Sequence, residues 1–438
     1  MKLKRELGLF EAVAYGVGVI LGAGVFALIG QAAGMAGNSL WVSFTISAFI
    51  AALTGLSYAE LSGMYPKAAA EFVYVKKAYG SEFWAFIISW LLIFTGVVAV
   101  ATISLGFSGY LFEILNLPRH FQSQISVLIS IVLIIVLSLV NFYGIKESSK
   151  LNIIFTSMEM LSLLAIIVLG FWKMSTTAYL NYFEAPKGLS GVFSAATIVF
   201  FAYLGFEDVV NISEETKTPR KHIPIALLLS IIITTFIYIL ISISVINLVG
   251  WQELAASPAP LALAASKVLG DKAFLLISIS ALFATSSTAL ILLVVVSRMV
   301  YGMAKEGTFP KILEKIHSKT RTPYMAAIVV MLLSIFFVFV GNIEIIAKVT
   351  SLGSLIAFSA VNLSLIHLRY TRPEIKRHFK TPFNIGKFPL TAFFGVISCM
   401  ILMAYFELEL ILLSLGVLLA GSMFFAIRKI RTSKKGAI

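Results

Sequence analysis

Long apolar stretches alternate with short polar segments along the whole chain. A membrane-spanning helix needs about 20 mostly apolar residues, and twelve stretches reach about this length. They cover residues 10–33, 40–64, 83–112, 124–143, 151–173, 191–212, 225–249, 272–303, 323–341, 344–368, 388–406 and 409–428. The pattern therefore predicts an all-α membrane protein with twelve transmembrane helices joined by short loops.

The composition agrees with a membrane protein. Hydrophobic residues make up 59% of the chain and charged residues only 13%, whereas soluble proteins carry about 25% charged residues. The loops are too short for a separate soluble domain, so we predict a single membrane domain over 1–438. Cys399 is the only cysteine and the five histidines are scattered, so we expect no metal site, no cofactor and no enzymatic activity.

Lysine and arginine are unevenly distributed between the two sides that twelve spans would create. Cytoplasmic loops carry an excess of these residues. With the N-terminus in the cytoplasm, only six of the 34 would lie outside: Arg119, Lys173, Lys187, Lys267, Lys272 and Lys348. We therefore expect a plasma-membrane protein with both termini cytoplasmic. This topology accounts for the net charge of +13, and we expect the lipid bilayer but no nucleic acid as a partner.

The first apolar stretch is unusually rich in glycine. The segment GVGVILGAGVFALIG, Gly16 to Gly30, holds five glycines, and glycine weakens a helix by about 1 kcal/mol relative to alanine. A break at Gly22-Ala23-Gly24 would expose amides that suit a carboxylate and carbonyls that suit an ammonium group. The alternative is close helix packing through small residues.

A second interruption lies in the sixth apolar stretch, FFAYLGFEDVVNISEETKTPRKHIP. Gly205 is followed there by Glu207 and Asp208. Interrupted helices at corresponding positions of two halves indicate a transporter binding site between inverted repeats. The first and sixth stretches each begin a set of five, which divides the chain into repeats 1–173 and 191–369 followed by two further helices over 388–428. Two interruptions in this arrangement favour a transporter.

Several segments together resemble the amino acid–polyamine–organocation transporter superfamily. They are the glycine stretch, YAELSGMYPKAAAEFVYV (Tyr58 to Val75), the sixth stretch and AKEGTFPKIL (Ala304 to Leu313). The resemblance implies a leucine-transporter-type fold, in which two inverted five-helix repeats have broken helices 1 and 6 and two peripheral helices follow. It also implies transport of amino acids or related amines by alternating access.

The resemblance further implies the residues that contact the substrate. The substrate carboxylate would meet the amides of Ala23 and Gly24 beside Gly22, and the amino group would meet the carbonyls of Ile20, Phe201 and Leu204 next to Gly205. The ring of Phe201 would act as a gate. Family positions that select the side chain are apolar here, at Val97, Val100 and Leu292. We therefore expect neutral amino acids, although Glu207 leaves cationic substrates open.

Ionisable and hydroxyl groups in the apolar stretches are candidates for energy coupling, because intramembrane charges are costly. Glu159 matches the position of a lysine in some proton-coupled relatives, and with Glu207 it could bind a proton. Thr285, Ser286 and Ser287 lie near the sodium site of the family. The alternative for Glu159 is an ion pair with a basic neighbour, or a position at the helix edge.

The charged segment Glu214 to Lys221 is predicted to be either part of a cytoplasmic gate or a solvated loop. Glu60 and Glu71 are expected to be solvated or salt-bridged at helix ends. Taken together, the sequence predicts a secondary active permease for neutral amino acids, coupled to protons. A sodium-coupled symporter and an amino acid or polyamine exchanger are alternatives. An ion channel is a remote one, because the sequence has no repeated filter signature.

Overall fold

The computed structural model describes residues 3–115, 122–174, 181–257, 259–339 and 343–435. Nine long helices dominate these residues: α1 (Leu9–Ala36), α2 (Leu40–Met64), α4 (Glu82–Ile114), α5 (Gln122–Tyr143), α6 (Ile145–Met174), α9 (Pro219–Val249), α12 (Asp271–Lys305), α14 (Ile343–Thr371) and α16 (Leu408–Lys435). The shorter helices are α3 (Ala70–Tyr79), α7 (Gly188–Phe200), α8 (Asp208–Asn211), α10 (Trp251–Ala256), α11 (Pro260–Leu269), α13 (Tyr324–Val338) and α15 (Leu390–Met403). The described strands, β1 (Asn384–Ile385) and β2 (Phe388–Pro389), have two residues each and form an antiparallel hairpin.

The all-α membrane class is confirmed. Within the described residues, ten helical segments are long and apolar enough to cross a membrane. Two predicted spans correspond to shorter helices, because α13 has 15 residues and α15 has 14. At 1.5 Å per residue these helices measure roughly 21–23 Å, less than the hydrocarbon thickness of about 30 Å. Twelve spans and the inverted repeat therefore stay predictions.

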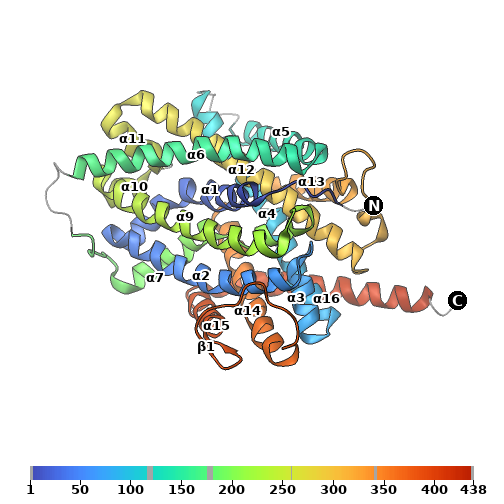
Figure 1. Cartoon of the computed structure of the whole chain (residues 1–438). Helices are drawn as coiled ribbons and strands as arrows, with labels where there is room; N and C mark the ends of the chain where they lie inside the picture. The colour runs from blue at the N-terminus through green and yellow to red at the C-terminus, as the bar shows by residue number, and fades with distance from the viewer. Residues whose placement is uncertain (1–2, 116–121, 175–180, 258, 340–342, 436–438) are drawn as a thin grey trace.

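The helices pack around α1, which contacts α6, α7, α9 and α12. An interior helix must be apolar on all sides, and the almost continuous apolar sequence of α1 meets this requirement. Helices α5, α6 and α16 instead expose large apolar side chains, for example Leu128, Leu164 and Leu419. In Figure 1 the N-terminal segment and the end of α16 lie at the same end of the molecule. Exposed leucines on outer helices are what a lipid-facing surface requires.

The first predicted interruption is present in α1. Gly22 has non-helical backbone angles, φ 7° and ψ −152°, inside an otherwise helical segment. A Cβ on Gly22 would overlap the hydroxyl of Thr288 on α12, and one on Gly18 would overlap Thr156 on α6. The glycines therefore serve both predicted purposes, because they break the helix and also let its neighbours pack against the backbone.

The second interruption separates α7 from α8. A 3₁₀ turn (Phe201–Tyr203) follows α7, Leu204 is extended, and Gly205 has φ +114°. This backbone conformation strongly favours glycine, and a Cβ there would also lie 2.7 Å from Val19 of α1. The two interruptions thus face each other in the interior.

Candidate substrate-binding site

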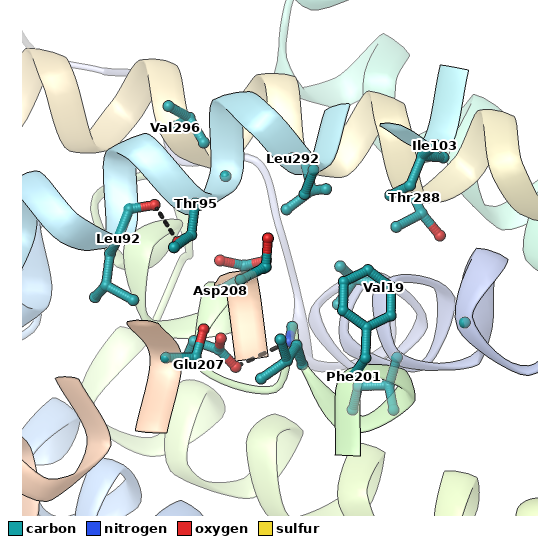
Figure 2. Close-up of a pocket in the computed structure, with 18 of the residues that line it drawn as sticks. Val19, Leu92, Thr95, Ile103, Phe201, Glu207, Asp208, Thr288, Leu292 and Val296 are labelled. Atoms are coloured by element: carbon teal, nitrogen blue, oxygen red, sulfur yellow. Dashed lines mark hydrogen bonds between the residues drawn. The ribbon is translucent and has the colours of Figure 1, made fainter. Parts of the chain in front are cut away.

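A cavity of about 60 Å³ lies where the two interruptions meet α4, α12 and α14 (Figure 2). This volume accommodates a few water molecules or a small ligand group. Among the predicted contact residues, those that line it are Ile20, Ala23, Gly24, Phe201, Leu204, Gly205 and Leu292, whereas Gly22 is not among the lining residues. The coupling candidate Glu207 also lines the cavity. The structure therefore brings together most of the residues that were predicted in the first and sixth apolar stretches, which correspond to α1 and to the segment from α7 to α8.

Hydrogen bonds tie the broken backbone of α1 to its neighbours. The amide of Ala23 donates to Thr288 Oγ1 over 3.2 Å. The hydroxyl of Tyr238 on α9 lies within hydrogen-bond distance of three carbonyls, those of Ile20, Leu21 and Ala202. Tyr238 is fully buried and joins both interruptions. Sequence reasoning missed it, since one tyrosine in an apolar helix gives no periodic signal.

The apolar wall on α4 differs from the prediction. Leu92, Thr95, Gly96, Ala99 and Ile103 face the cavity, whereas the predicted Val97 and Val100 are buried elsewhere and are not among its lining residues. Residues three or four apart share one face of a helix. The face of α4 that lines the cavity is therefore a different one from the face that was predicted. From α12, Leu292 lines the cavity as predicted, together with Val296 and Met299.

Three carboxylates line one end of the cavity. Glu207 accepts a hydrogen bond from the amide of Gly205 at 2.8 Å, Asp208 follows it, and Glu71 reaches the cavity from α3. In Figure 2, Asp208 lies between Thr95 of α4 and the ring of Phe201, and Glu207 lies below Asp208. None of the described acids belongs to a group arranged to hold a metal ion.

Glu71 corrects an expectation from the sequence. It is fully buried, and its two oxygens accept from the Nδ2 of Asn211, at 3.2 and 3.4 Å, instead of forming a salt bridge in the described structure. Its helix, α3, lies outside the candidate membrane spans, and burial raises the pKa of the Glu71 carboxyl to about 7. Asn211, on α8, was not predicted at all. Glu60, in contrast, is salt-bridged as expected, to Arg369 and Arg377.

The remaining coupling candidates lie outside the cavity. Glu159 is fully buried in the middle of α6, and neither of its oxygens has a partner among the described residues. Ser287 donates to Asn152 Oδ1 at 2.7 Å and lies 3.5 Å from Thr156 Oγ1. Thr285 donates to carbonyls of its own helix, and Ser286 is buried. Among the α12 hydroxyls, that of Ser287 thus links α12 to α6.

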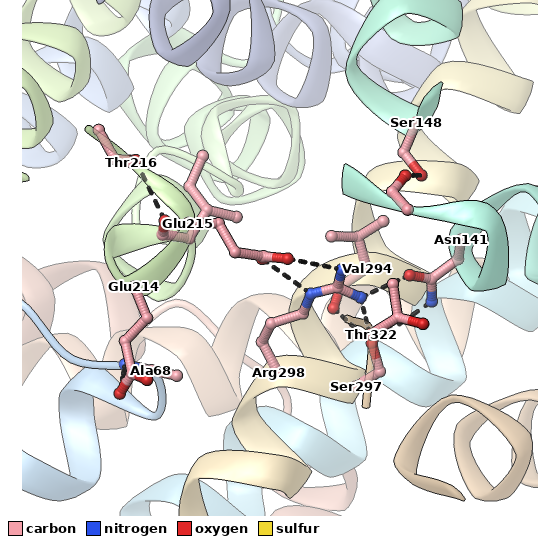
Figure 3. Close-up of polar contacts among 12 residues, drawn as sticks. Ala68, Asn141, Ser148, Glu214, Glu215, Thr216, Val294, Ser297, Arg298 and Thr322 are labelled. Carbon is pink, nitrogen blue, oxygen red and sulfur yellow. Dashed lines mark hydrogen bonds and ion pairs between the residues drawn. The ribbon is translucent and has the colours of Figure 1, made fainter. Parts of the chain in front are cut away.

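The predicted charged segment Glu214 to Lys221 begins after α8, and in Figure 3 Glu215 points toward Arg298 while Glu214 points away from it. Glu215 forms a two-pronged ion pair with Arg298 of α12, with both N–O distances 3.0 Å and both side chains at most 1% exposed. Asn141 and Ser297 accept from the same guanidinium group. Glu214 instead pairs with Lys305, which is 43% exposed. The sequence did not predict Arg298 as the partner of Glu215.

An apolar bundle with two facing interruptions and a cavity between them defines a membrane transport protein. The family model described as amino acid permease matches residues 7–427, and the chain belongs to this family. The relatives are permeases and transporters, which are not enzymes.

Three relatives illustrate the range of the family. The branched-chain amino acid permease BcaP of Bacillus subtilis is 30% identical over 87% of this chain and 84% of its own. The methylthioribose transporter of the same organism is 29% identical over 87% and 85%. The vacuolar cationic amino acid transporter 4 of Arabidopsis thaliana is 29% identical over 85% of this chain and 64% of its own. These names refer to branched-chain amino acids, methylthioribose and cationic amino acids.

Proposed function

We propose that this protein is a secondary active transporter that carries neutral amino acids by alternating access. The observation that supports this function is the cavity between the interruptions, which is lined by residues of both interruptions and by apolar side chains from α4 and α12. A helix N-terminus favours negative charge, so the second half of α1 suits the substrate carboxylate. The walls then suit a small apolar side chain.

The substrate proposal rests on the wall, because the names of the relatives differ in substrate. Leu92, Ala99, Ile103 and Leu292 offer no partner for a charged side chain. Pockets that bind small molecules are mostly apolar with a few placed polar groups. This pocket matches that description.

Uptake by the purified protein in liposomes tests the proposal. We expect leucine, valine or alanine to be accumulated, and to compete better for uptake than arginine or putrescine. The reverse ranking would exclude neutral amino acids as the main substrates. A saturating rate without ionic current distinguishes transport from a channel.

We also propose twelve spans with both termini in the cytoplasm. The short helices α13 and α15 would complete the count, and the shared end of the two termini in Figure 1 fits an even number. In a Cys399→Ser background, a cysteine placed at Ser318 should react with a membrane-impermeant thiol reagent from the inside. A cysteine at Ser257 should react from the outside. Opposite labelling would contradict this orientation.

Proton coupling is proposed to use Glu159. A fully buried carboxyl without a partner among the described residues suits a group that is neutral when protonated and must be solvated or paired when charged. One elementary charge moved through 100 mV supplies about 2.3 kcal/mol. The site of Ser287, Thr156 and Asn152 supports sodium as the alternative, because hard cations prefer oxygen ligands.

The Glu159→Gln variant separates these two coupling ions. Uptake by the wild type should rise with an inward proton gradient and should not need sodium, because the carboxyl must be protonated in each cycle. Glu159→Gln should lose the dependence on the proton gradient and keep only downhill exchange. Uptake that requires sodium and ignores pH would refute proton coupling, and an unchanged Glu159→Gln profile would remove this residue from it.

A further inference from the structure

The cavity is electrostatically unbalanced. Glu71, Glu207 and Asp208 line it, and its described lining contains no lysine, arginine or histidine. Arg298 is a buried cation, but it is already paired with Glu215. Buried charges are stable only when they are paired and hydrogen-bonded or become neutral. A positively charged ligand would balance this end of the cavity.

Asp208 is the carboxylate with free accepting capacity. It is 8% exposed, and its Oδ2 has no hydrogen-bond partner. Glu207 is held by the amide of Gly205, and Glu71 is held by Asn211. The other two carboxylates therefore have donors within the protein, while Asp208 lines the cavity and its buried Oδ2 has no donor.

The carbonyls that the family resemblance assigns to the amino group are partly engaged. The Ile20 carbonyl accepts from the Tyr238 hydroxyl, and the Phe201 carbonyl accepts from the amide of Leu204 at 3.2 Å. An ammonium group carries three donors. A carboxylate gives it a stronger acceptor than a carbonyl does, because the full negative charge of the carboxylate adds a coulombic attraction to the hydrogen bond.

We propose that Asp208 anchors the ammonium group of the substrate, with Glu207 and Glu71 adding negative potential behind it. This inference rests on the proposed function and deepens it. It makes the primary ammonium group the indispensable part of the ligand. A small apolar amine without a carboxylate should then still bind, whereas a carboxylic acid without an amine should not.

Competition in liposomes tests this selectivity. The labelled substrate is the best transported of alanine, valine and leucine, and if none is transported the proposed function itself fails. The competitors are its amine analogue (ethylamine, 2-methylpropylamine or 3-methylbutylamine) and its acid analogue (propionate, 3-methylbutanoate or 4-methylpentanoate). In the wild type we expect the amine to inhibit and the acid to be without effect. Stronger inhibition by the acid would overturn the inference while leaving the transport function intact.

Variants of Asp208 assign the effect to this residue. A hydrogen bond to a charged group contributes about 1.5–3 kcal/mol, so Asp208→Asn should weaken inhibition by the amine roughly 10- to 100-fold. Asp208→Glu should restore part of it. Glu253→Gln, a change on exposed α10, should match the wild type. An unchanged inhibition constant for the amine in Asp208→Asn would refute the role of Asp208. If that variant does not fold, the wild-type ranking and Asp208→Glu still decide.

Discussion

Replacing Gly24 with leucine is expected to abolish uptake while the protein still inserts into the membrane. A Cβ on Gly24 would lie 2.7 Å from Ala202 Cα and 2.9 Å from Ala202 Cβ. The Ala202 backbone belongs to the turn after α7, so it cannot move aside without displacing the second interruption. Even Gly24→Ala should reduce uptake about tenfold or more, because overpacking costs about 1–3 kcal/mol. Initial rates in liposomes, normalised to the inserted protein, measure the effect.

Gly106→Ala is the matched control for this change. Gly106 lies within α4, and a Cβ there would meet no atom within 4 Å. Alanine is the better helix former by about 1 kcal/mol, so this variant should transport like the wild type and be at least as stable. Normal uptake by Gly24→Leu would show that the close approach of the two interruptions is not required for transport.

Removing the guanidinium group with Arg298→Ala is expected to destabilise the protein by about 3–5 kcal/mol. The change leaves the carboxylate of Glu215 buried without its charged partner, and breaking a buried ion pair typically costs this much. It also removes a donor from Asn141 and Ser297. A large fall in the thermal unfolding midpoint of the purified protein in detergent is the expected measurement.

Lys305→Ala is the control for Arg298→Ala. Lys305 pairs with Glu214, the residue next to Glu215 in the chain, and Lys305 is exposed at the surface. Exposed ion pairs contribute about 0–1 kcal/mol, so its unfolding midpoint should stay close to that of the wild type. Adding Glu215→Gln to Arg298→Ala should recover part of the loss, since the unpaired charge is then absent. Equal stability of Arg298→Ala and Lys305→Ala would mean that the buried pair does not hold this region together.

The element boundaries show how much a hydrophobic pattern can predict. The stretch 40–64 coincides with α2, and 272–303 lies within α12. Such agreement is physical, because lipid excludes unpaired backbone groups and leaves a long apolar segment little choice but a helix. Charged segments between apolar stretches were harder to assign, and α3 was not predicted as a helix. It spans ten residues, Ala70–Tyr79, with lysines in its last turn.

Within the site, Gly205 lines the cavity as predicted, whereas Val97 does not. Glycine in an apolar helix is a local signal, since only the backbone conformation is at stake, and both interruptions were predicted from it. Which side of α4 faces the cavity depends on the rotation of that helix against α12 and α14. The sequence of α4 is apolar on every side, so it contains no amphipathic pattern that would indicate this rotation.

By itself the sequence determined the membrane class, the positions of most helices and the two interruptions, because each depends on interactions within one segment or with the solvent. Only the tertiary structure decided that Glu71 joins Glu207 and Asp208 at one cavity, that Tyr238 links the two broken segments and that Arg298 pairs with Glu215. These residues are far apart in the chain. Their chemistry depends on distances that the packing of several uniformly apolar helices sets, and a one-dimensional pattern carries no record of those distances.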